Sequence, residues 1–411
     1  TCAKAHRSGV RLPAGVRDWL PHELARKREI EQQMRAVFGR WAYEEVQTPI
    51  IERFDVLERG LGEETAELLF QFNDRRSTAL ALRPEMTTPV ARLVSTRMRD
   101  VPLPIRLAYV APVFRYYEQP QEGRMRELTQ AGVELIGAAG IDADAETLFM
   151  AIEALAEIWL PDARFDINDA RVVDGILDGV GFHSERARAA KEHIKRRNLV
   201  ALRTLGEPAL VEFAQRRGGH DAIARAREIC RTPESLAALG ELEAILDRAA
   251  ALGYGARVTV DFALLRDLEY YTGFLFEGYV EEIGMSLCGG GRYDSLLPRF
   301  GFDVPAVGWT AGVERLLIAL ERRGKHVRQR RHRIDVLVAG SDVVAARERA
   351  AGNVVRYAGS DLCDEALLEE ARAYAIPRVV IAVDGTVREL RVGPRVDAIP
   401  VPRHPSNWDA R

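Results

Sequence analysis

The chain has 411 residues, of which 47 % are hydrophobic and 29 % charged, and this balance is typical of a water-soluble protein of two or three domains. The formal net charge of −3 gives no overall attraction for nucleic acid, and no apolar run approaches the roughly 18 residues of a membrane span. The four cysteines lack the spacing of a metal site or a disulfide framework, and the first residues lack the apolar core of a signal peptide, so we expect a cytoplasmic protein.

The N-terminal part predicts a polar start, a long helix and a strand. Residues 1–12 are mostly polar, and we expect them to be disordered. Apolar residues recur at helical spacing from His22 to Tyr43, which predicts an amphipathic helix. The next stretch, Glu44 to Glu52, predicts a strand that contains Pro49. Because proline cannot donate to a sheet ladder, this strand suits a sheet edge or an interface.

The stretch LALRPEMTTPVAR, residues 80–92, predicts a strand that turns into a helix. Thr87 or Thr88 can cap that helix, because a hydroxyl accepts hydrogen bonds from its first amide groups. Arg83 and Glu85 can pair with each other at the helix entrance.

Residues 113–137 predict two strands joined by a polar loop, because apolar residues alternate at both ends and Pro120 and Gly123 mark the centre. Arg124 in this loop lies in a charge cluster that could equally be a solvated loop.

The middle of the chain is mostly helical in pattern. Residues 142–160 predict one helix, and residues 172–253 predict an inserted helical subdomain with breaks at glycine and proline. Its most basic piece runs from Ala190 to Asn198. That piece could be the wet face of a helix, or it could contact RNA or a partner protein.

The strings RDLEYYTGFLFE (residues 266–277) and CGGGRYDSLL (residues 288–297) are the most distinctive. The first predicts a strand, and the second is a glycine triplet followed by Arg292, Tyr293 and Asp294. Glycines without Cβ atoms allow a ligand or a neighbouring strand to approach closely. A tight hairpin with packed tyrosines is the simpler interpretation for either string alone.

The C-terminal part predicts a basic linker and a small domain. Residues 322–333 carry seven Lys and Arg, and we expect a solvated linker there. Residues 334–411 alternate strand and helix patterns, which predicts a small α/β domain. This domain has 10 Arg and 12 Asp plus Glu and no Lys, a net of −2, whereas a nucleic-acid surface needs the opposite sign.

These motifs together resemble histidyl-tRNA synthetase, a class II aminoacyl-tRNA synthetase, and its paralogue, the regulatory subunit of ATP phosphoribosyltransferase. The resemblance runs from Pro13 to about Leu320. It implies an α+β fold, with an antiparallel sheet flanked by helices in residues 13–321. The stretches around Pro49, at 113–137 and at 306–317 resemble class II motifs 1, 2 and 3, and motif 1 forms a homodimer interface.

The resemblance also implies a histidine site without a metal or a cofactor. Glu85 and Thr87 would bind the α-amino group, and the tyrosines would recognise the imidazole. Arg115 and Arg315 would remain from an ATP site. The implied histidine-binding residues are Glu85, Thr87, Arg115, Gln130, Glu134, Arg266, Tyr270, Tyr271 and Tyr293.

Departures from the synthetase pattern favour the regulatory paralogue. Tyr117 stands where a synthetase has the glutamate that reads adenine, and Glu118 is displaced by one residue. Asp267 and Glu269 replace a glycine and an aspartate beside Arg266. The resemblance then implies a non-catalytic subunit that binds the short catalytic subunit of ATP phosphoribosyltransferase and confers inhibition by histidine. We expect a homodimer within a hetero-oligomer, and no nucleic-acid or membrane partner.

Two alternatives stay open. A histidyl-tRNA synthetase with a diverged tail would use ATP and Mg²⁺, and the retained arginines favour it. An amino-acid sensor outside histidine synthesis would have the same kind of pocket. A hydrolase is not expected, because no Ser/His/Asp or Cys/His constellation is found in the sequence.

Overall fold

The structure is a computed structural model that describes residues 12–61, 67–265, 271–324, 334–358, 363–383 and 386–392. The chain divides into two compact units, Thr1–Val327 and Arg328–Arg411. The predicted disordered start and most of the predicted linker lie outside the described residues. Within the described part of the chain, no helix combines the length and the apolar character that crossing a membrane requires.

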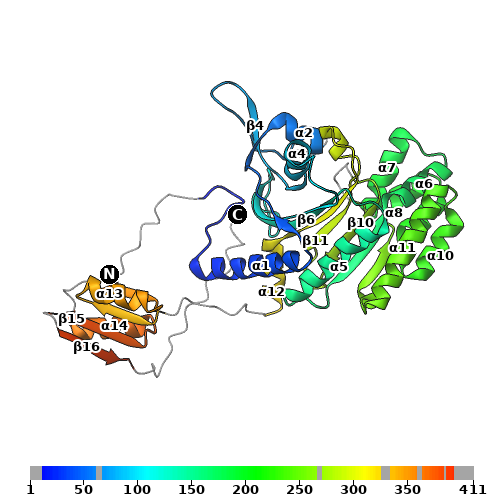
Figure 1. Ribbon diagram of the computed structural model, residues 1–411. Helices are drawn as coiled ribbons and strands as arrows, with labels where there is room; N and C mark the ends of the chain where they lie inside the picture. The colour runs from blue at the N-terminus through cyan, green and yellow to red at the C-terminus, as the bar shows by residue number, and fades with distance from the viewer. Residues whose placement is uncertain are drawn as a thin grey trace, which may run out of the picture. The chain divides into compact units, whose positions relative to one another are not determined.

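A nine-stranded sheet forms the centre of the first unit (Figure 1), in the order β1-β5-β6-β12-β11-β10-β7-β9-β8. Its central strands, from β5 to β7 in that order, run antiparallel to one another, whereas β1 is parallel to β5 and β9 is parallel to β7. The strands are β1 (Glu44–Glu45), β5 (Ile105–Phe114), β6 (Glu127–Ile136), β7 (Arg164–Asp169), β8 (Arg217–Gly218), β9 (Val258–Asp261), β10 (Phe274–Tyr279), β11 (Cys288–Arg292) and β12 (Ala306–Gly312).

One face of this sheet is covered by helices α1 (Pro21–Arg40), α5 (Ile141–Glu157) and α12 (Val313–Arg322) (Figure 1). The apolar side of α1 packs on the sheet because its buried residues recur every three or four positions. Phe38 of this helix meets the ring of Trp309 edge to face at 5.8 Å between centroids. This face carries the main core of the unit.

On the other face, α4 (Thr87–Arg97) and the short helix η2 (Leu297–Phe300) cover the outer strands. Buried apolar residues of α4 and alternate residues of β5 form a second core there. Between α4 and the central strands, the described side chains on this face are mostly polar or charged.

The predicted strand from Glu44 to Glu52 is divided between two sheets. Its first residues form β1, and its last belong to a three-stranded sheet in the order β2-β4-β3. Pro49 is exposed in the connection between them. The members of this sheet and the helix after it are β2 (Ile51–Arg53), β3 (Gln71–Asn73), β4 (Ala79–Leu82) and α2 (Phe54–Leu61).

Ala42 lies in the turn before β1 with a φ of +60°, in the left-handed region that favours glycine. The chain therefore keeps this turn despite the side chain.

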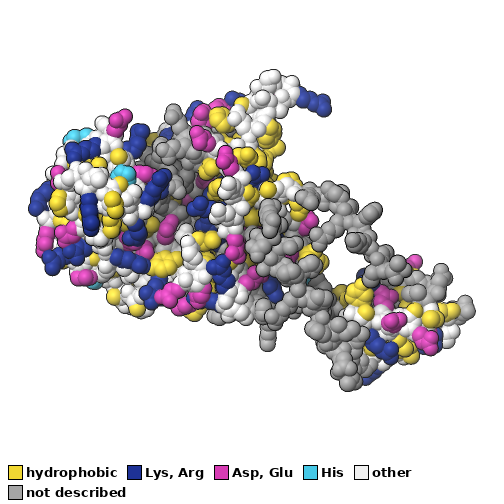
Figure 2. Space-filling model, turned by 180° about the vertical axis from the view of Figure 1, so that it is seen from behind, with side chains coloured by type: hydrophobic (Ala, Val, Ile, Leu, Met, Phe, Trp, Pro, Cys, Tyr) yellow, Lys and Arg dark blue, Asp and Glu magenta, His cyan; other side chains and the backbone are white. Residues whose placement is uncertain are grey.

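The helical insertion packs at the β7–β9 end of the sheet (Figure 1). Its charged side chains of both signs are mixed over the surface (Figure 2). In the basic piece, Arg196 and Arg197 pair with Glu192 and Asp261, so much of its positive charge is balanced locally. The helices are α6 (Ala170–Gly179), α7 (Ser184–Lys195), α8 (Leu199–Thr204), α9 (Pro208–Gln215), α10 (His220–Ile229), α11 (Pro233–Ala251) and η1 (Gly255–Arg257).

The second unit contains a four-stranded sheet in the order β14-β13-β15-β16, in which only β16 runs antiparallel to its neighbour. Two separate apolar clusters hold α13 and α14 against the sheet. The elements are β13 (Val336–Ala339), α13 (Asp342–Ala350), β14 (Val355–Ala358), α14 (Asp364–Ala373), β15 (Arg378–Val383) and β16 (Thr386–Arg391).

Two sequence-based boundaries differ from the structure. The strand expected over residues 266–277 begins only at Phe274, and residues 266–270 lie outside the described ranges. The expected linker starts too early, because α12 continues to Arg322. Arg323 forms ion pairs with Asp162 and Glu282 of the core.

Candidate functional site

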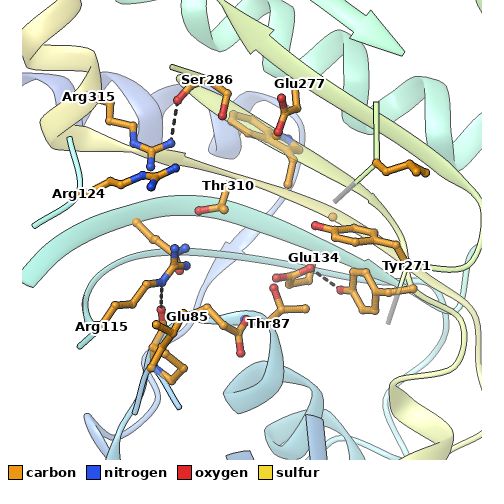
Figure 3. A pocket seen from close by; sticks show the side chains of 18 of the residues that line it. Glu85, Thr87, Arg115, Arg124, Glu134, Tyr271, Glu277, Ser286, Thr310 and Arg315 are labelled. Carbon is orange, nitrogen blue, oxygen red and sulfur yellow. Dashed lines mark hydrogen bonds between the residues drawn. The ribbon is translucent and has the colours of Figure 1, made fainter. Parts of the chain in front are cut away.

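A cavity of about 400 Å³ lies on the open face of the large sheet. Its floor is formed by β6, β12, β11 and β10, and its walls by the start of α4 and the loop between β5 and β6. Residues far apart in the sequence meet here (Figure 3). The predicted residues that line it are Glu85, Thr87, Arg115, Gln130, Glu134, Tyr271, Tyr293 and Arg315. The other two predicted residues, Arg266 and Tyr270, lie outside the described residues.

Glycines make room for this cavity on the floor strands. A Cβ at Gly308 would lie 2.0 Å from Oε2 of Glu134 and 2.5 Å from the carbonyl oxygen of Val133. Because β12 pairs with β6 so that Gly308 lies opposite Glu134, only a residue without a side chain leaves space for this carboxylate. Gly308 therefore serves the site by its lack of a side chain.

Glu85 is fixed at the entrance of α4. Its Oε2 accepts a hydrogen bond from the backbone amide of Thr87 at 2.6 Å, and its Oε1 accepts one from Thr88 at 2.9 Å. The expected threonine cap is therefore wrong: no side chain of the N-cap residue bonds the helix, and Glu85 satisfies its first amides. Oε1 of Gln130 accepts from the amide of Met86 at 3.1 Å, which joins this turn to the sheet.

Arg83 does not pair with Glu85, although the sequence allowed this. Its guanidinium is 1 % exposed and donates to the carbonyl oxygens of Thr48 (2.6 Å), Pro49 (3.2 Å) and Pro112 (2.9 Å). Arg83 therefore ties the Pro49 connection to β5, and the carboxylate of Glu85 is left to the cavity.

Glu134 is the most buried acid of the cavity, at 1 % exposure. The phenol of Tyr293 donates to its Oε2, and the phenol of Tyr109 donates to its Oε1 at 3.0 Å. Burial raises the pKa of this carboxyl to about 8, and these hydrogen bonds only partly offset the cost of removing the charge from water. At neutral pH Glu134 is therefore largely protonated.

Three arginines gather at the opposite end of the cavity (Figure 3). Arg115 donates from Nε to the carbonyl oxygen of Pro84 at 2.8 Å. Arg315 donates to the carbonyl oxygens of Gly123 (3.0 Å) and Ser286 (2.9 Å). Arg124 lines the same end, so it is more than part of a solvated loop.

Several lining residues were not among the predicted site residues. Glu277 and Ser286 face the cavity near Arg315 (Figure 3), and Thr310 lies on the floor between the two ends. The alternation of side chains along β10 could have predicted Glu277. It pairs with Gly289 of β11 and therefore lies on the same side of the sheet as that glycine, which also lines the cavity. Tyr109 donates a hydrogen bond to Glu134 but is not among the described lining residues, and no sequence motif singled it out.

The lining combines acidic, basic and aromatic side chains. Its described residues include no histidine and no cysteine, and no group of three or more metal-ligating side chains occurs in the described part of the chain. Two buried carboxyl groups at one end, Glu85 and Glu134, suit an ammonium and a ring nitrogen, and arginines suit a carboxylate or another anion.

The raised pKa of Glu134 makes the protein less stable at higher pH. The folded protein holds a proton that the unfolded chain releases above the ordinary pKa of 4.5, so this contribution is full below pH 4.5 and is lost as pH rises to about 8. We expect the stability of Glu134→Gln relative to the wild type to grow by on the order of 4 kcal/mol across this range. Urea unfolding at several pH values measures the difference, and a constant difference would contradict the raised pKa.

Comparisons with known proteins agree with this geometry. A profile of histidyl-tRNA synthetases matches residues 15–316. The ATP phosphoribosyltransferase regulatory subunit of Moorella thermoacetica is 40 % identical over 390 residues, which cover 92 % of this chain and 93 % of that protein.

Two solved structures are similar over most of the chain. One, described as an ATP phosphoribosyltransferase regulatory subunit/histidyl-tRNA synthetase from Bacillus halodurans, has a TM-score of 0.77 at 29 % identity over 90 % of this chain and 97 % of that chain. A histidyl-tRNA synthetase from Nostoc sp. PCC 7120 has a TM-score of 0.74 at 21 % identity over 93 % and 96 % of the two chains, a likeness of fold alone. The predicted α+β fold of class II synthetase type is confirmed, and the chain belongs to the ATP phosphoribosyltransferase regulatory subunits of the histidyl-tRNA synthetase family.

Proposed function

We propose that this chain is a non-catalytic subunit that binds the short catalytic subunit of ATP phosphoribosyltransferase, supports its activity and makes it sensitive to histidine. The observation that carries this proposal is the division of the cavity. At one end Glu85, Glu134 and Tyr293 are arranged for an amino acid with a nitrogen-containing ring. At the other end the arginines expected for ATP phosphates donate to backbone carbonyls.

Histidine would bind with its ammonium group near Glu85 and its ring near Glu134. A buried carboxylate paired with an ammonium gives a charge-assisted hydrogen bond, and the tyrosines pack against the ring. Inhibition follows by linkage if histidine binds the less active conformation of the assembly more tightly than the active one.

The adenine side of the cavity supports the loss of aminoacylation. Tyr117 lines the cavity where a synthetase would place the glutamate that reads adenine, and Glu118 is exposed and is not among the described lining residues. A one-residue shift in an extended segment turns a side chain to the opposite side.

A histidyl-tRNA synthetase is the second candidate. The observation that favours it is the presence of Arg115, Arg124 and Arg315 at one end of the cavity. Histidine-dependent ATP–pyrophosphate exchange, together with calorimetric titration of histidine, separates the two functions. We expect histidine to bind without exchange. Robust exchange would mean that the arginines still act on ATP, and the regulatory proposal would fail.

We also propose a homodimer formed through the surface around Pro49. Ile50 and Ile51 are 41 % and 49 % exposed beside this proline, and Phe72 on the same small sheet is 38 % exposed. Neighbouring exposed apolar side chains of this size suit an interface.

Ile50→Glu is expected to convert the dimer to monomers, raising its dissociation constant by about 100-fold or more, because the interface would bury an unpaired charge. Sedimentation equilibrium measures the change. Val200→Glu in the helical insertion, where the side chain is 74 % exposed, is the matched control and should leave the dimer intact. If Ile50→Glu remains a dimer with an unchanged dissociation constant, the interface lies elsewhere on the protein.

A further inference from the structure

Tyr109 of β5 reaches the cavity without lining it. The residue is 1 % exposed, and its ring packs in the apolar core formed by α4 and β5. Its phenol nevertheless donates to Oε1 of Glu134 at 3.0 Å, on the opposite side of the carboxylate from Tyr293. A side chain so placed cannot touch a ligand, but it can control the group that does.

The sheet register creates this contact. Tyr109 lies opposite Gly132, and Glu134 is the diagonal neighbour two residues along β6 on the same face. A Cβ at Gly132 would lie 2.8 Å from the phenol oxygen, so the absence of a side chain lets the Tyr109 ring cross β6 toward Glu134. Gly308 makes the corresponding room on the other side of Glu134. The carboxylate is therefore oriented by two glycines and two phenols.

The groups around Glu134 act on its charge in opposite directions. Hydrogen bonds from Tyr109, Tyr293 and Thr87 favour the ionised carboxylate, whereas burial and the nearby charge of Glu85 favour the protonated form. Burial and the two acids also raise the pKa of the Tyr109 phenol well above its ordinary value. Tyr109 therefore stays a hydrogen-bond donor throughout the range in which Glu134 titrates.

We propose that Tyr109 is a positioning residue that orients the Glu134 carboxyl and sets the pH range over which the cavity binds an imidazole ligand. The identity of that ligand rests on the proposed function. The effect of Tyr109 on Glu134 does not rest on the proposed function, because it can be measured without any ligand.

A single proton shared between Glu134 and the ring explains why pH matters. A free imidazole has a pKa of about 6.5, and Glu134 has a pKa of about 8. Between these values the protein carries the proton and the ligand is neutral, so the complex forms without net proton exchange. At lower pH one proton must leave, and at higher pH one must be taken up. Affinity for histidine should therefore be greatest between the two values.

Removing the Tyr109 phenol should move only the upper limit. Tyr109→Phe keeps the ring but takes one donor from the ionised carboxylate, so the pKa of Glu134 rises further. We expect the fall in histidine affinity above pH 8 to shift upward by roughly half a pH unit to one unit. The lower limit belongs to the ligand and should not move. If the α-amino group of histidine set the upper pH limit instead, that limit would be the same in the wild type and in Tyr109→Phe.

The experiment is calorimetric titration of histidine from pH 5.5 to 9.5 on the wild type, Tyr109→Phe and Tyr43→Phe. Tyr43 is the matched control, because it is 5 % exposed and its phenol donates to Oε1 of Glu146 at 2.8 Å, outside the cavity lining. An upper limit that moves in Tyr109→Phe alone supports the proposal. Identical profiles in all three proteins would reduce Tyr109 to a packing residue.

Infrared titration of the empty proteins gives a readout that needs no ligand. The carboxyl C=O band of Glu134, assigned with Glu134→Gln, should disappear at higher pH in Tyr109→Phe than in the wild type. If histidine fails to bind but this band shifts, the proposed ligand is wrong and the role of Tyr109 stands. If Tyr109→Phe does not fold, 3-fluorotyrosine at position 109 keeps the hydroxyl as a stronger donor, and the band should then move to lower pH; an unmoved band would overturn the proposal.

Discussion

Replacing Glu85 by glutamine is expected to weaken histidine binding by about 100-fold and to leave the fold intact. The carboxylate is 4 % exposed, and both oxygens already accept from the first amides of α4, so it is held in one direction. An ammonium bound there gains a charge-assisted hydrogen bond that a neutral amide cannot replace, a loss of about 2 to 3 kcal/mol. Calorimetric titration of histidine at pH 7 measures it.

Glu52→Gln is the matched control for this change. Glu52 is also buried, at 8 % exposure, and its Oε1 accepts a hydrogen bond at 3.2 Å from Nε of Arg92 in the same helix. It is not among the described residues that line the cavity. Its replacement should cost stability and leave histidine affinity unchanged. Equal affinities for Glu85→Gln and the wild type would show that the ammonium binds elsewhere or that this cavity takes another ligand.

Replacing Arg292 by methionine is expected to lower the free energy of unfolding by about 3 to 5 kcal/mol. Arg292 ends β11, and its guanidinium contacts Oδ1 of Asp144 at 2.8 Å and the carbonyl oxygen of Gly140 at 3.1 Å. Asp144 has a side chain only 3 % exposed, and its pKa is already raised to about 6 by burial. Without the arginine, this acid of α5 remains buried with no compensating charge.

A double-mutant cycle identifies the cause of that loss. If the unpaired acid is responsible, Asp144→Asn in the Arg292→Met background should recover part of the stability. Urea unfolding of the wild type, both single variants and the double variant gives the coupling free energy. A loss below about 1 kcal/mol for Arg292→Met would mean that water reaches Asp144 in the variant.

The resemblance predicted that Glu85, Gln130, Glu134 and Tyr293, which come from separate stretches, share one site, and all four line the same cavity. The glycines of β11 that mark this part of the fold are a local property, visible in the sequence. That the cavity binds histidine stays a prediction.

Contacts that depend on register between distant strands could not be predicted. Tyr109 approaches Glu134 only because β5 pairs with β6 so that Gly132 stands between them. Arg83 has carbonyl partners from two other parts of the chain rather than its sequence neighbour Glu85. Sequence spacing favours local partners, and buried guanidinium groups are satisfied by whichever carbonyls the fold leaves without donors.

The carbonyl partners of the arginines also depend on tertiary structure. Arg315 could be matched to motif 3 from the sequence, but its contacts with Gly123 and Ser286 depend on two loops that meet only in the folded protein. Retained motif residues are therefore weak grounds for retained chemistry.

The most direct test is phosphoribosyl transfer by the cognate short catalytic subunit, measured with and without this chain and with increasing histidine. We predict that the catalytic subunit gains activity when the chain is added, and that histidine then inhibits it. Glu85→Gln should still support activity but should shift inhibition to about 100-fold higher histidine. Failure of the chain to change phosphoribosyl transfer, together with histidine-dependent ATP–pyrophosphate exchange by the chain alone, would contradict a regulatory role and identify a synthetase.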